Sequence, residues 1–288
     1  MASFRKQYKM AEAVPGMISC EEYEAKLTTE YDALLADPDR TESEYQSFFE
    51  KNPCMLPCYG NMNHGLIHSC LFSQPIINND AKRRVPDFMW IASNSLQLMP
   101  ILIEIERPAK SAYRKSDQVQ NALFSQAENQ ILEWKTILED NKNDFYDRYC
   151  IPERLRARRF SPRFILIYGR REEFARDPFL ARKRAQKNDG GLELVSFDRL
   201  WPSRDMMLFP CGKMKKGKIG LISVPPTLKL GPTIAKDLSL WDGFDEVVDT
   251  NDIISPERKD FLKTRYRYWE NFGALATDKG VVRTGDWE

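Results

Sequence analysis

The sequence predicts a mixed α/β fold in which helices flank a central sheet. Three patterns favour it: capping signals before apolar residues at helical spacing, two apolar strands separated by a short turn, and a later strand–helix–strand order. The 288 residues suffice for one large or two modest domains with a buried core. We expect an N-terminal helical segment at 1–40, a core at 41–205 and an appended C-terminal region at 206–288.

Two helices are indicated near the N-terminus. Ser19 and Glu22 form a capping-box pattern ahead of apolar residues at helical spacing, and that helix should end near Asp37. Thr41 and Glu44 form a second capping-box pattern, and the helix that follows should be broken before Pro53.

Two strands are expected next, over 85–92 and 96–106, followed by a long helix from about Ser116 to Glu139. Further strands are expected at 163–169 and 192–197, on either side of a charged helix at 172–186, and another at 219–224. A last helix should begin near Pro256. The expected buried stripe of the long helix comprises Val119, Leu123, Ala127, Ile131, Trp134 and Leu138.

Overall charge gives no indication of a partner, because 43 Lys and Arg residues balance 42 Asp and Glu residues. The longest apolar run, Leu98–Ile103, is too short to span a membrane, and the N-terminus has no apolar signal-peptide core. We therefore expect a soluble, cytoplasmic protein with no membrane partner.

Three of the six cysteines and both histidines lie close together in the sequence, as Cys54, Cys58, His64, His68 and Cys70. They could supply zinc ligands, but their spacing lacks the tight Cys-x-x-Cys pair of structural zinc sites. We favour reduced, buried thiols, and zinc remains the alternative.

Three carboxylates are expected to meet at one rim of the sheet. Strand alternation puts Glu104 and Glu106 on the same face, and hairpin pairing puts Asp87 opposite the end of their strand. Such a cluster is costly unless a cation neutralises it, and hard oxygen ligands favour Mg²⁺ or Mn²⁺. The alternative is that these acids form ordinary surface ion pairs with bases such as Arg107 and Lys110.

Asp87, then Glu104 and Glu106 after a turn, then a helix that carries Gln130, resemble the core of the PD-(D/E)XK nucleases. More specifically, the chain is similar to the Shedu anti-phage nuclease family, whose segments occur in the same order over about 41–205. The matching segments are Glu44–Pro53, Val85–Phe88, Ile103–Pro108, Ala127–Trp134, Ile167–Arg170 and Ser196–Leu200.

This resemblance implies a restriction-endonuclease-like core and metal-dependent hydrolysis of DNA in prokaryotic defence, with Mg²⁺ or Mn²⁺ as cofactor. Asp87 and Glu104 would hold the metal, which would acidify its bound water and stabilise charge on the phosphate. Glu44 would anchor a water or a second metal, and Gln130 would orient a ligand or a phosphate. Phage or plasmid DNA is the expected partner, and a homo-oligomer the expected assembly.

Residue 106 departs from the family pattern, because glutamate stands where a lysine is expected. A lysine donates to the attacking water or to developing negative charge, whereas an ionised glutamate only accepts. Two schemes follow. Either Glu106 is a third metal ligand and general base, or a cation moves in from Lys110 or Lys115.

A basic segment is the expected nucleic-acid surface, because residues 148–187 hold 13 Lys and Arg against 4 acids. The alternative for this segment is solubilising charge that pairs with the acidic stretch 237–252. Two functions stay open: a DNA endonuclease, or an inactive nuclease-fold module that binds nucleic acid or a protein. The candidate phosphate-binding residues are Arg154, Arg156, Arg158, Arg159, Arg170 and Arg171.

Overall fold

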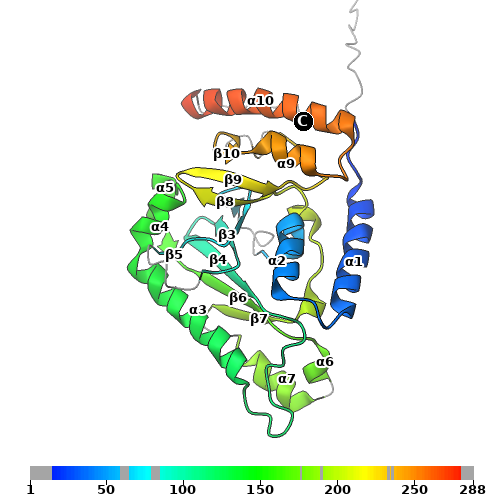
Figure 1. Ribbon diagram of the computed structural model, residues 1–288. Helices are drawn as coiled ribbons and strands as arrows, with labels where there is room; N and C mark the ends of the chain where they lie inside the picture. The colour runs from blue at the N-terminus through cyan, green and yellow to red at the C-terminus, as the bar shows by residue number, and fades with distance from the viewer. Residues whose placement is uncertain are drawn as a thin grey trace, which may run out of the picture.

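One mixed sheet runs through the computed structural model, which describes residues 15–58, 65–78, 85–175, 177–188, 191–231, 234 and 237–279. Its strand order is β10-β9-β8-β2-β3-β4-β6-β7, with β1 paired to β3 and β5 to β4 (Figure 1). The predicted mixed α/β fold is confirmed. The strands are β1 Gly65–Leu66, β2 Leu71–Ser73, β3 Phe88–Ser93, β4 Gln97–Ile105, β5 Arg159–Phe160, β6 Arg163–Ile167, β7 Leu192–Val195, β8 Cys211–Lys215, β9 Lys218–Ser223 and β10 Trp241–Asp242.

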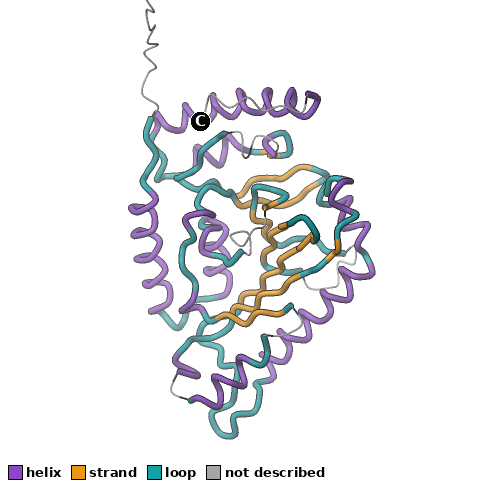
Figure 2. Tube along the Cα trace, turned by 180° about the vertical axis from the view of Figure 1, so that it is seen from behind, coloured by secondary structure: helices purple, strands orange, loops and turns teal. Residues whose placement is uncertain are grey.

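Helices cover both faces of this sheet (Figures 1 and 2). Helices α1 and α2 lie on one side and α3 and α4 on the other, while α9 and α10 lie beyond β9. Within the described residues, every helix is too short or too polar to cross a membrane. The helices are α1 Cys20–Ala36, α2 Glu42–Lys51, α3 Ala122–Asp140, α4 Lys142–Arg148, α5 Glu153–Arg156, α6 Glu172–Ala175, α7 Pro178–Ala185, α9 Phe244–Thr250 and α10 Pro256–Lys279.

Both N-terminal helices begin where their capping boxes predict. Ser19 Oγ accepts from the Glu22 amide, and the Glu22 carboxylate accepts from the Ser19 amide. Thr41 and Glu44 form the second box, and α2 ends at Lys51 before Pro53. These local signals are sufficient because each box satisfies amides that the first helical turn leaves without partners.

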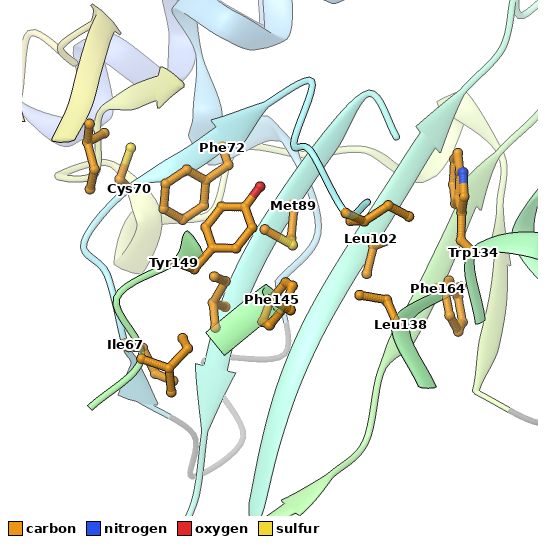
Figure 3. Packing of buried hydrophobic residues seen from close by; sticks show 14 of the residues in the cluster. Ile67, Cys70, Phe72, Met89, Leu102, Trp134, Leu138, Phe145, Tyr149 and Phe164 are labelled. Carbon is orange, nitrogen blue, oxygen red and sulfur yellow. The ribbon is translucent and has the colours of Figure 1, made fainter. Parts of the chain in front are cut away.

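The two faces of the sheet carry separate apolar cores. Alternation along β4 sends Ile101, Ile103 and Ile105 to the core under α1 and α2, and Leu102 to the core under α3. Figure 3 shows the second of these cores, where Leu102 lies between Met89 on one side and Trp134 of α3 and Phe164 of β6 on the other.

The long helix begins later than its sequence predicts. It starts after Asn121, whose side chain caps the Leu123 amide, rather than near Ser116. The preceding residues form a turn in which Gln118 has φ 55° and Tyr113 bridges to Gln120. Val119 and Leu123 are therefore exposed, at 47% and 49%, and the prediction that they are buried was wrong. The buried stripe comprises Phe124, Ala127, Gln130, Ile131, Trp134, Ile137 and Leu138.

The expected charged helix at 172–186 is two short helices, because Asp177 caps the new helix that starts at Pro178. The C-terminal part of the chain contributes strands to the same sheet. Strand β8 pairs in parallel with β2 through Leu71 and Cys211, and β9 and β10 continue outward from it. The sheet is therefore continuous across residue 206.

Candidate functional site

Asp87 and Glu104 lie opposite each other at the end of an antiparallel strand pair. Strands β3 and β4 pair Phe88 with Ile103, so the next residues outward are Asp87 and Glu104. The amide of Ile105 donates a 2.8 Å hydrogen bond to Asp87 Oδ2 and fixes that carboxylate against β4. The predicted hairpin geometry is confirmed for these two residues.

The Glu104 carboxylate is buried, with 8% of the residue exposed. Gln130 of α3 donates from Nε2 to Glu104 Oε1 at 2.7 Å, whereas Oε2 is buried and has no hydrogen-bond partner in the described part of the chain. Burial, and after it the nearby Asp87, raises the pKa of Glu104 well above its usual value. Burial also raises the pKa of Asp87 to about 7. Asp87 thus opposes the ionisation of Glu104, whereas the hydrogen bond with the Glu104 carboxyl favours the ionisation of Asp87.

Glu106 continues from β4 and is paired with Lys110. The ammonium of Lys110 donates to Glu106 Oε2 and also lies 3.8 Å from Glu42 Oε2. Burial and the charge of Glu106 raise the pKa of Glu42. The nearby ammonium of Lys110 partly offsets this increase. Helix α2 therefore brings a fourth carboxylate, Glu42, to the end of the sheet.

Glu44 is not part of this group. It accepts from the Thr41 amide at 2.8 Å and pairs with Arg40, and these hydrogen bonds lower its pKa to about 2. Helix α2 thus places Glu42, two positions before the predicted Glu44, near the end of β4. The sequence offered a signal: a capping box occupies the glutamate at its third helical position, which leaves Glu42 available.

The Asp87 and Glu104 side chains offer donors that suit a divalent cation. The buried Glu104 carboxylate, with one bare oxygen, and the partly buried Asp87 carboxylate beside it are a hard-oxygen donor set whose repulsion a cation would relieve. Across the described ranges, no three His, Cys, Asp or Glu side chains are gathered so that they could hold a metal ion. Mg²⁺ commonly binds through one or two carboxylates and keeps waters, so the pair fits it. A third ligand from Glu106 stays a prediction.

A cleft of about 940 Å³ is lined by Lys110, whereas Glu42, Asp87, Glu104 and Glu106 are not among its lining residues. Its walls come from the α1–α2 corner, the loop after β4 and the segment that carries α6, and Lys110 and Lys115 both line it. Glu173 of α6 accepts from Ser111 Oγ at 2.7 Å and from the Tyr113 amide at 2.8 Å, which holds that loop in place. Lys115 is exposed, and within the described residues it makes no hydrogen bond or ion pair with these carboxylates.

The predicted phosphate-binding arginines fall into two groups. Arg170 and Arg171 follow β6 and line the cleft, where Arg170 pairs with Asp198 at 2.8 Å. Arg159 pairs with Gln97 at the opposite end of β4, which places it about 23 Å from Glu104 at about 3.3 Å per residue. Arg154, Arg156 and Arg158 lie in the same segment, where Arg156 pairs with Asp147 and Arg158 with the Asn94 carbonyl.

The cysteines and histidines do not assemble into a zinc site within the described residues. Cys54 packs in the core under α1 and α2, and Cys70 in the core on the other face of the sheet. His68 is buried against the Tyr149 carbonyl at 2.6 Å, and His64 lies outside the described residues. The sheet separates the thiols that a zinc ion would have to join.

Fold and site together define a mixed α/β protein with a carboxylate pair and a lysine at the ends of its central strands. The model of the family described as Shedu protein SduA, C-terminal, matches residues 39–201. The chain belongs to this Shedu family, which acts in anti-phage defence. No curated protein matches it.

Proposed function

We propose that the protein is a Mg²⁺- or Mn²⁺-dependent DNA endonuclease of anti-phage defence, with a PD-(D/E)XK-like core. The observation that carries this proposal is the Asp87–Glu104 pair, in which a partly buried carboxyl faces a buried one and Glu104 Oε2 has no partner in the described residues. Perturbed carboxyls beside a cleft are typical of catalytic sites. A purely structural pair would be expected to have its buried oxygens satisfied.

Asp87 and Glu104 would hold the divalent cation, with hydrogen bonds from the Ile105 amide and Gln130 fixing their orientation. When bound, that cation would supply an acidified water and stabilise charge on the scissile phosphate. Lys110 takes the role of the lysine that is missing at residue 106, because its ammonium reaches the same end of β4. Glu106 holds this ammonium in position and is the third candidate ligand.

The DNA backbone would lie in the cleft that Lys110 lines rather than along the arginines at the far end of β4. Within the described residues, the side chains of Lys115 and Arg171 line the cleft without an ion-pair partner, so both can meet phosphates. Several acids that line the cleft are engaged in structural contacts: Asp37 with Arg40, Asp198 with Arg170, and Glu173 with Ser111. Lys115 and Arg171 are therefore the proposed phosphate contacts in a lining that carries six Lys or Arg and five Asp or Glu side chains.

Cleavage of supercoiled plasmid and of linear DNA in Mg²⁺, Mn²⁺ or EDTA tests the proposal. We expect cleavage with either metal, none in EDTA, and none by Asp87→Asn or Glu104→Gln. Glu133→Gln is the matched control, because Glu133 is an exposed carboxylate of α3. DNA binding without cleavage in any metal would instead favour the non-catalytic binding module.

A further inference from the structure

Four carboxylates and one ammonium meet at the end of β4, counted among the described residues. The acids are Glu42, Asp87, Glu104 and Glu106, and the ammonium is that of Lys110. The four acids form two pairs, and the ammonium neutralises only one of them. Lys110 contacts both Glu42 and Glu106, whereas in the described residues no cation contacts Asp87 or Glu104. Their carboxyls are hydrogen-bonded by the Ile105 amide, by Gln130 and to each other.

We infer that the Lys110 ammonium occupies the position of a second divalent cation, so that each chain takes up one divalent cation. This inference rests on the proposed function, because it takes the Asp87–Glu104 pair as the metal site. In two-metal hydrolytic sites the ions lie about 3.5–4 Å apart and share surrounding carboxylates. Here the second set of carboxylates, Glu42 and Glu106, already has a covalently tethered cation.

The ammonium is held by an ordered segment of the chain. The Lys110 amide donates to the Arg107 carbonyl at 3.0 Å, which closes a tight turn directly after β4. Next along the chain, Ser111 is anchored to Glu173, and Ala112 is fully buried. The Lys110 side chain is 21% exposed and that of Glu106 14%, so water screens their attraction only in part.

Charge and ligand chemistry both exclude a second metal while Lys110 is present. A divalent cation among the same oxygens would lie against the ammonium, and like charges at such distances repel strongly in a partly buried site. The ammonium also donates to the Glu106 oxygen that the metal would need, and it has no lone pair to offer as a ligand. Loss of this one positive charge should therefore open the second position.

Direct counting of bound Mn²⁺ tests this inference without reference to activity. Mn²⁺ binding to the full chain is followed by electron paramagnetic resonance and equilibrium dialysis. We expect one Mn²⁺ per chain in the wild type and two in Lys110→Met, which keeps the length of the side chain and removes its charge. Lys115→Met, on the rim of the same cleft, should still bind one. The double variant Lys110→Met/Glu42→Gln should bind closer to one Mn²⁺ per chain, because only Glu106 of the Glu42–Glu106 pair then keeps its carboxylate.

The outcomes separate the inference from the proposed function. One Mn²⁺ in both the wild type and Lys110→Met would overturn the inference alone. No Mn²⁺ in the wild type would overturn the proposed metal site, and the inference with it. Two Mn²⁺ in the wild type would contradict the inference and leave the metal site standing. Lys110→Gln provides a second neutral variant, and circular dichroism checks that each variant is folded.

Discussion

Gln130 Nε2 lies 2.7 Å from Glu104 Oε1 and joins the middle of α3 to the end of β4. This contact uses one oxygen of a buried carboxylate and leaves the other, Oε2, without a partner in the described residues. Gln130 is itself 94% buried, because only 6% of it is exposed. The amide therefore sets which way the carboxylate faces, and the free oxygen marks where a cation would bind.

Gln130→Ala should lower both the thermal stability and the cleavage rate. It removes the donor to a buried carboxylate oxygen, and an unsatisfied buried polar group costs about 1–3 kcal/mol. For a chain of this size each kcal/mol corresponds to about 2–4 °C in Tm. Calorimetry measures the loss, with Asn129→Ala as the control, since Asn129 is exposed on the same helix. An equal Tm for the two variants would contradict the role of Gln130.

Lys110→Ala should reduce cleavage by about 10²–10⁴-fold, the range for a lost acid–base or electrostatic contribution. Lys115→Ala should have a small effect on single-turnover rates at saturating DNA, because Lys115 is exposed and makes no contact with Glu106 in the described residues. Glu106→Gln should cost less than Lys110→Ala, since a glutamine oxygen still accepts from the ammonium. The reverse order, with Glu106→Gln the most damaging, would assign Glu106 the role of metal ligand or base.

Glu42→Gln should reduce cleavage more than Glu44→Gln does. Glu42 contacts Lys110 in the site, whereas Glu44 caps α2 and pairs with Arg40. Glutamine also serves at the third position of a capping box, so Glu44→Gln should leave the helix formed. Rates at saturating metal compare the two variants, and a larger loss for Glu44→Gln would return the site to that residue.

Without metal, the protein should lose stability as the pH rises from about 4 to above 7. Burial raises the pKa of Asp87 from 3.8 to about 7 and also raises the pKa of Glu104 well above its usual value. Because these pKa values are higher in the folded state than in the unfolded state, protonation of the two carboxyls stabilises the fold. This stabilisation is fully present below the unfolded pKa values and is lost as the pH rises through the folded ones.

The measurement is Tm against pH in EDTA for the wild type and for Asp87→Asn/Glu104→Gln, whose difference isolates these two groups. The Tm of the double variant should increase relative to that of the wild type as the pH rises. Mn²⁺ should raise the Tm of the wild type more at pH 8 than at pH 5. Parallel Tm curves would mean that the carboxyls titrate normally.

Removal of two charges from the cleft should weaken DNA binding more than removal of two from the far end of β4. The cleft variant is Lys115→Gln/Arg171→Gln, and the matched control is Arg154→Gln/Arg159→Gln, whose side chains are also exposed. Each lost phosphate contact should reduce the salt slope by about 1. Fluorescence anisotropy against salt concentration, in EDTA, measures this apart from cleavage. A stronger effect from the control pair would move the DNA path to the 154–159 segment.

Local patterns were sufficient for much of the fold. The two capping boxes gave correct starts for α1 and α2, and the apolar runs gave β3, β4, β6 and β7, because caps and strand alternation act between near neighbours. The start of α3 was wrong by six residues, because the 116–121 segment makes a turn that Asn121 ends. Strand β8 was not predicted, since it is stabilised by pairing with the distant β2.

The facing of Asp87 and Glu104 followed from the sequence alone, because a short turn between two strands fixes their register. The residues that surround this pair could not be predicted from the sequence. Glu42 rather than Glu44, Lys110 rather than Lys115, and Arg171 rather than Arg159 lie near the site because of how loops close and where parallel strands end. Such placements depend on contacts between residues far apart in the chain, which local spacing and charge do not encode.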